Sequence, residues 1–110
     1  MNKHITIHDV HGKVIRDNDT YKVTDNTDLD HLVVSQTILK PNKETLGHSH
    51  EGLEEVYFFS SGMGEMIVGE ESITVNSNSI VLIPAGEFHK VINSHSRPLI
   101  FTAVFEKYER

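Results

Sequence analysis

Three histidines and one glutamate are spaced in this chain as the donors to a single metal ion would be. His48 and His50 stand two residues apart, and Glu55 follows them at the start of an apolar run. Side chains two apart on a β-strand point to the same face, so both imidazoles can reach one cavity and Glu55 can join them from the next strand. His89 supplies a fourth donor from a distant part of the chain. Imidazole and carboxylate suit Zn, Mn, Fe, Ni or Cu, and the absence of cysteine excludes a thiolate site.

Each of these side chains also has an ordinary interpretation when it is taken alone. His48 and His50 could be two histidines on an exposed strand face, and His89 could be a hydrogen-bonded residue near a turn. The four together favour a metal site, because burying a glutamate among histidines is costly without a compensating charge. Glu54 competes with Glu55 for the carboxylate role. Neighbouring residues face opposite ways on a strand, and we assign Glu54 to the solvated rim.

The elements that must position these donors are strands. Strand-like runs recur about every ten residues between Gly, Asn, Asp and Pro, and no window of a dozen residues has the apolar spacing of a helix. Nine or ten short strands are expected, which is typical of a β-sandwich or barrel. The two close histidines are expected on a strand over residues 46–50, and another strand is expected around Ile5 and Ile7. Residues 18–30 are polar and are predicted to form a surface loop.

The donor pattern resembles the two sequence motifs of the cupin superfamily. The resemblance covers residues 42–93. The opening glycine of each motif is an asparagine here, Asn42 and Asn78, and asparagine is the non-glycine residue that best tolerates a left-handed backbone. The positions that match the first motif and then the second are His48, His50, Glu55 and Gly62, followed by Pro84, Gly86, His89 and Asn93.

This resemblance implies an all-β fold, a double-stranded β-helix or jelly-roll barrel, formed by a single domain over residues 1–110. It also implies that one divalent transition metal is held by His48, His50, Glu55 and His89. Asn93 could serve either a turn or the site. The residues that we expect to line a substrate pocket beside the metal are Gln36, Ile38, Tyr57, Ile83 and Phe101.

Two classes of function remain open at this point. Three histidines and a glutamate leave about two positions open on an octahedral ion. The resemblance implies an enzyme that uses Lewis-acid or dioxygen chemistry on a sugar, keto acid or hydroxy acid, as an isomerase, dioxygenase, decarboxylase or lyase. A likeness to mannose-6-phosphate isomerase would be natural, but the sequence shows no cluster of Lys and Arg for a phosphate. The alternative is a non-catalytic, metal-dependent module that binds a sugar or another small ligand.

Composition limits the partners. The formal net charge of −6 argues against binding to nucleic acid or to an anionic membrane surface, and no apolar run approaches the ~20 residues of a membrane span. The lack of cysteine and of a secretory signal leads us to expect a cytoplasmic protein. The expected partners are a small-molecule ligand and a second copy of the chain. A homodimer is predicted because edge strands invite pairing, with contacts near Ile5 and Ile7 and over residues 105–108. The histidines assigned to the surface are His4, His8, His11, His31 and His95.

Overall fold

Ten β-strands follow one another along residues 1–108, the part of the chain that this computed structural model describes. Their number agrees with the sequence prediction, and the described residues form no helix that could span a bilayer. The strands are β1 (Lys13–Asp17), β2 (Tyr21–Asn26), β3 (Leu32–Leu39), β4 (Lys43–Glu44), β5 (Glu55–Ser61), β6 (Met63–Val68), β7 (Glu71–Asn76), β8 (Ile80–Ile83), β9 (His89–Asn93) and β10 (Leu99–Glu106).

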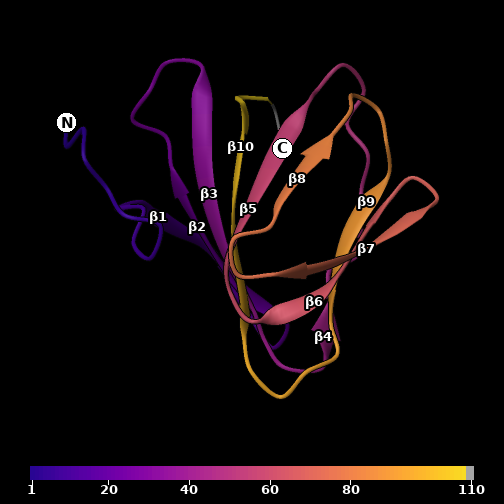
Figure 1. Ribbon diagram of the computed structural model, residues 1–110. Coiled ribbons are helices and arrows are strands. Elements are labelled where there is room, and N and C mark those ends of the chain that lie inside the picture. Colours follow the sequence, from indigo (N-terminus) through magenta and orange to yellow (C-terminus); the bar gives the residue numbers. More distant parts are fainter. Residues whose placement is uncertain (109–110) are drawn as a thin grey trace.

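The strands form two antiparallel sheets that face each other (Figure 1). One sheet has the order β1-β2-β3-β10-β5-β8, and the other has the order β4-β9-β6-β7. From β3 onward the chain passes back and forth between the sheets, because β4, β6, β7 and β9 belong to one sheet and the strands between them to the other. This is a jelly-roll barrel, and it confirms the predicted all-β double-stranded β-helix.

Apolar side chains fill one end of the space between the sheets. Phe59, Met66, Val75 and Leu99 are almost completely buried there, and full burial of such a side chain contributes about 1.5–3 kcal/mol. The predicted metal donors lie toward the other end, because Glu55 begins β5 and His89 begins β9. The packed end therefore holds the two sheets together, while the donor side chains lie toward the opposite end.

The polar segment over residues 18–30 is not a surface loop, and that prediction was wrong. It contains β2, which pairs with β1 on one side and β3 on the other. Asp25 and Asn26 are buried, and the Asn26 side-chain amide donates a hydrogen bond of 2.8 Å to the carbonyl of Val10. The backbone ladder and this tie to the N-terminal segment outweigh the low strand propensity of Asp and Asn.

Two predicted strands are replaced by single bridges. The segment around Ile5 and Ile7 shows only an isolated bridge between Thr6 and Asp9, and residues 46–50 show only one between His48 and His89. The expected left-handed turns are confirmed, because φ is 59° at Asn42 and 80° at Asn78.

Candidate metal centre

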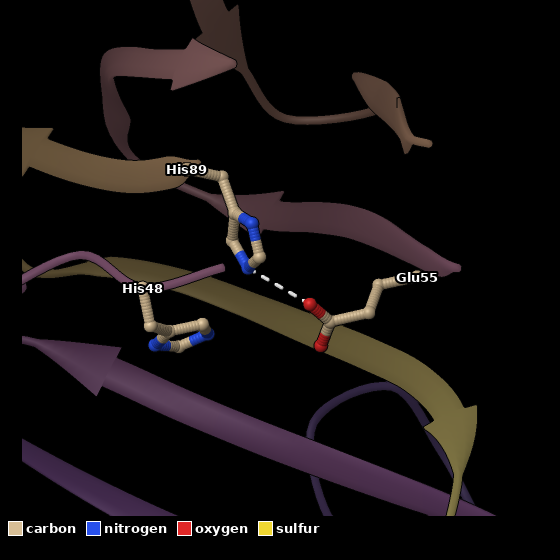
Figure 2. Close-up of side chains that lie close together, drawn as sticks. All are labelled: His48, Glu55 and His89. Carbon is tan, nitrogen blue, oxygen red and sulfur yellow. Dashed lines mark ion pairs between the residues drawn. The ribbon is translucent and has the colours of Figure 1, made fainter. Parts of the chain in front are cut away.

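Three of the four predicted donors meet between the two sheets. His48, Glu55 and His89 each offer one ligand atom, and these atoms all lie within 4.8 Å of one another. Figure 2 shows the two imidazoles and the carboxylate turned toward one another from separate parts of the chain. The backbones of His48 and His89 exchange two hydrogen bonds, of 3.1 and 2.9 Å, so the irregular segment that carries His48 is fixed directly to β9.

The contact between Glu55 and His89 is the most informative feature of this cluster. Both side chains are almost completely buried, and His89 Nε2 lies 2.8 Å from Glu55 Oε2. His89 Nδ1 lies 3.0 Å from the carbonyl oxygen of Glu87, to which it can only donate a hydrogen bond. In the neutral ring, the lone pair of Nε2 therefore faces an anionic oxygen. Within residues 1–108 neither atom has a hydrogen-bond partner of good geometry, so the pair requires a proton or a cation.

The donor set fits a divalent ion. Two adjacent ligands, each about 2.1 Å from one ion and at right angles, lie about 3 Å apart, which is close to the spacing of Glu55 Oε2 and His89 Nε2. The bond from His89 Nδ1 to the Glu87 carbonyl is the support that metal-bound imidazoles usually receive, because it fixes the tautomer and aims Nε2 at the ion. A bound cation would also give the two unpartnered atoms their missing partner.

Without a metal, His89 is biased toward its protonated form. Burial lowers the pKa of His89. The Glu55 carboxylate and the Glu87 carbonyl together raise it by more than burial lowers it, so the pKa lies above the usual 6.5. A proton on Nε2 can thus take the place of the cation beside Glu55. Metal binding must displace this proton.

We expect the metal-free protein to lose stability as the pH rises above 6.5. A raised folded-state pKa contributes stability that is fully present below the unfolded value and is lost as the pH rises through the folded value. Urea unfolding in the presence of a chelator, at pH 6 and at pH 8.5, measures this loss. The Glu55→Gln variant removes the carboxylate that raises the pKa and should show a smaller loss. A wild-type stability that increases over this range would contradict the prediction.

His50 lies beside the cluster rather than in it. Its ring centroid is 4.5 Å from that of His48 and 6.3 Å from that of His89. Its Nε2 lies 3.1 Å from the hydroxyl of Tyr108, and the two rings are also in contact. His50 therefore stays a predicted ligand, and its Nε2 could bind an ion only after the contact with Tyr108 is broken.

Comparisons with known proteins place this chain in a family. A family model described as "Cupin domain" matches residues 35–105 of the chain. The chain is a cupin. An uncharacterized protein of Methanocaldococcus jannaschii is 30% identical over 66 residues, which cover 60% of this cupin and 53% of that protein. The cupin thus spans about half the length of this curated relative.

Solved structures share the fold. A protein with a double-stranded β-helix domain from Klebsiella pneumoniae matches with a TM-score of 0.81 and 20% identity, over 96% of this cupin and 90% of that chain. A predicted oxalate decarboxylase from Thermotoga maritima matches with a TM-score of 0.77 and 17% identity, over 89% of this cupin and 95% of that chain. At these identities the likeness concerns the fold.

The cluster of candidate metal donors in this cupin opens on a cavity of about 510 Å³. A volume of this size is typical of sites for small molecules. Of the predicted pocket residues, Tyr57 and Phe101 line the cavity, and their rings stack with centroids 5.1 Å apart. His48, His50, Glu55 and His89 line it too, so an ion held by the cluster would lie at the cavity wall.

Three predicted pocket residues do not line this cavity. Gln36 and Ile38 lie on the opposite face of β3, and the Gln36 amide donates a hydrogen bond of 3.1 Å to the carbonyl of Ile7. Ile83 is buried in the apolar core. The inward residues of β3 are instead Ser35 and Thr37.

The prediction for β3 was wrong because the face of this strand that points into the barrel is the more polar one. Ser35 and Thr37 face the cavity, whereas the face with Gln36 and Ile38 meets the N-terminal segment or the outside. Other cavity residues that we missed come from β1, β2 and the C-terminal segment, namely Arg16, Tyr21 and Tyr108. No sequence spacing connects them to the motifs.

Asn93 serves the fold of the turn after β9. It is almost completely buried, and its amide nitrogen donates to the carbonyls of Leu39, Lys40 and Arg97 over 3.2, 3.2 and 2.8 Å. Its side-chain oxygen accepts a hydrogen bond from the backbone of His95. Asn93 does not line the cavity.

Gly47 is expected to be essential for placing His48. Its φ is +83°, and a Cβ atom at this position would lie 2.4 Å from the Phe88 ring. Gly47→Ala should therefore weaken Zn²⁺ binding and lower stability by more than the about 1–2 kcal/mol that a left-handed alanine costs. Gly52→Ala is the matched control, because Gly52 also has a positive φ but open space around its Cβ position. Equal effects of the two variants in chelator competition and urea unfolding would contradict this role.

Proposed function

We propose that this cupin is a metal-dependent enzyme that acts on a small oxygen-bearing molecule, such as a sugar, keto acid or hydroxy acid. The observation that carries the proposal is the position of the His48, Glu55 and His89 cluster in the wall of a cavity large enough for such a molecule. Glu55 and His89 are buried while His48 is exposed, so the cluster has a protein side and an open side.

The residues that line the cavity divide into those that would bind the ion and those that would orient a substrate. Glu55 and His89 would hold the ion from the protein side and His48 would hold it from the cavity. His50 would join them once its contact with Tyr108 is broken. A bound divalent ion supplies Lewis-acid polarisation of a substrate oxygen, or dioxygen chemistry if it is iron. The hydroxyl groups of Ser35, Thr37 and Thr45 line the same cavity and can orient polar oxygens of a substrate by hydrogen bonds.

The stacked rings of Tyr57 and Phe101 form an apolar part of the cavity wall. They exclude water from one side of a bound molecule, which strengthens electrostatic interactions at the ion.

The proposal requires that water and small molecules can reach the bound ion, and this can be measured. Mn²⁺-loaded protein should increase the relaxation rate of water protons above that of free Mn²⁺, and added small hydroxy or keto acids should reduce the increase as they replace water. Loaded protein should also show dioxygen-uptake or isomerase activity in a substrate screen. This activity should be lost with a chelator and in the His89→Ala variant. An ion that water cannot reach would instead favour the alternative function, a binding module with a structural metal.

The expected homodimer gains support from the outer face of β8. Leu82 and Ile80 are 71% and 59% exposed on this edge strand, so a second copy of the chain would bury apolar surface there. Light scattering should give about twice the chain mass of 12.4 kDa, and Leu82→Glu should shift the protein to the monomer. A wild-type monomer would overturn the prediction. A cytoplasmic location remains a proposal from composition.

A further inference from the structure

The wall of the cavity differs in charge from the rest of the chain. The sequence holds 16 acidic and 10 basic residues, but Glu55 is the one carboxylate among the described residues that line the cavity. Two basic side chains, Arg16 and Lys90, line it as well. With a divalent ion bound, the cavity would carry positive charge in a strongly acidic protein. Clefts lined by one sign of charge concentrate ligands of the opposite sign.

Arg16 is the basic residue whose charge is left for a ligand. Lys90 is already paired with Glu44, with 2.9 Å between Nζ and Oε1. Within residues 1–108, in contrast, no carboxylate lies within ion-pair distance of Arg16. Arg16 is an exposed residue at the cavity wall, and a guanidinium group without an acidic partner can bind a carboxylate or phosphate there through two parallel hydrogen bonds.

A β-bulge brings Arg16 to the cavity. In the pairing of β1 with β2, Val14 lies opposite Thr24 and Arg16 lies opposite Val23, so Ile15 is an extra residue in β1. In a regular strand, Ile15 and Arg16 would point to opposite faces. Both line the cavity instead. Bulges re-aim side chains in this way and are common next to functional sites.

The position of Arg16 indicates where the anionic group of a ligand would lie. β1 and β5 are separated in their sheet by β2, β3 and β10. Adjacent strands lie about 4.8 Å apart, so about 19 Å of curved sheet separates β1 from β5. The strand pairings also place Arg16 level with Phe59, four residues along β5 from Glu55, which adds roughly 13 Å along the strands. The side chains reach inward from both ends of this span. A ligand that reaches both Arg16 and the ion must therefore carry its anionic group away from its metal-binding oxygen.

We propose that Arg16 selects the substrate class of this site: small metabolites that bind the ion through a hydroxyl or carbonyl oxygen at one end and carry a carboxylate or phosphate at the other. This inference rests on the proposed function, because it requires an ion open to the cavity. It adds a specificity residue from β1, outside both sequence motifs. Binding is the property to measure, since it needs no knowledge of the reaction.

Calorimetry with Zn²⁺-loaded protein tests the proposal through matched ligands. 2-Hydroxyglutarate and 2-hydroxyvalerate share the metal-binding end, but only the first has a distal carboxylate. 3-Phosphoglycerate and glycerate form the corresponding pair for a distal phosphate. In the wild type, at least one distal anion should improve affinity about tenfold, and the pair that responds identifies the group. Arg16→Gln should abolish this preference without changing Zn²⁺ affinity. Arg97→Gln, which removes the same charge outside the cavity, should retain it.

The outcomes separate the two ideas. If affinities are equal within both pairs, or if Arg16→Gln keeps the preference, the role of Arg16 is refuted and the metal function stands. If the loaded protein binds none of the four acids, the role of Arg16 is refuted, and the water-proton relaxation of the Mn²⁺-loaded protein decides separately whether the ion is accessible.

Discussion

Replacing His89 with alanine is expected to lower the affinity of the protein for Zn²⁺ by about a hundredfold or more. Structural zinc sites with four ligands bind with roughly 10–16 kcal/mol, so one ligand is worth on the order of 3 kcal/mol, or about a hundredfold. His89 should reach at least this value because it is held in place. Its ring is buried, its Nδ1 bonds to the Glu87 carbonyl, and its Nε2 faces Glu55 at 2.8 Å. Competition with a chromophoric chelator measures the affinity.

Two further variants separate a lost ligand from a damaged fold. Glu55→Gln keeps the volume of the side chain but removes its charge, and it should weaken Zn²⁺ binding strongly while circular dichroism shows an intact sheet. His95→Ala removes an exposed histidine outside the cluster and should bind Zn²⁺ as the wild type does. If His89→Ala and His95→Ala bound Zn²⁺ equally well, the cluster would not be the metal site.

His50 differs from the other predicted ligands in the contact that its ring makes. Its Nε2 is engaged with the Tyr108 hydroxyl, whereas the other three donors face one another. Tyr108→Phe keeps the ring contact and removes the hydroxyl. If His50 must leave Tyr108 to bind the ion, this variant should bind Zn²⁺ more tightly than the wild type.

The sequence predicted the fold because its signals were local and regular. Short β-branched and aromatic runs between turn residues indicate strands wherever they occur, and the left-handed turns at Asn42 and Asn78 followed from the residue type. The convergence of His48, Glu55 and His89 followed from spacing and from the resemblance, since donors to one ion must lie on elements that meet. The strand expected over residues 46–50 did not form, but the single bridge between His48 and His89 of β9 still holds His48 at the cluster.

The cavity wall could not be predicted in the same way. The direction of a strand is inferred from which alternate residues are apolar, and in β3 the residues that face the cavity, Ser35 and Thr37, are the polar ones. Gln36 and Ile38 were therefore predicted on the wrong face of the strand. Arg16 depends on a bulge, which shifts alternation by one position and leaves no mark in the sequence. Alternation of apolar and polar residues therefore fails to predict which face a side chain lies on where the buried face is polar or where a bulge interrupts the strand pairing.

Removing the metal is expected to lower the melting temperature of the protein by roughly 15–30 °C. An ion present at about a thousand times its dissociation constant stabilises the folded state by about 4 kcal/mol, and each kcal/mol shifts the melting temperature of a domain of this size by about 4–8 °C. The structural reason is that Glu55 begins β5 in one sheet and His89 begins β9 in the other. The ion would therefore join the two sheets at the end that lacks the apolar core.

Calorimetric melting of Zn²⁺-loaded and chelator-treated protein at pH 7.5 measures this difference. Loading replaces any proton between His89 Nε2 and Glu55 with an ion of higher charge that His48 can also bind, so the loaded form gains a link that the metal-free form lacks. The Glu55→Gln variant should melt at nearly the same temperature with and without Zn²⁺. A melting temperature of the wild type that stays the same with chelator would contradict this prediction. It would show that the apolar end alone holds the two sheets together, and that a proton is enough to compensate the buried pair of Glu55 and His89.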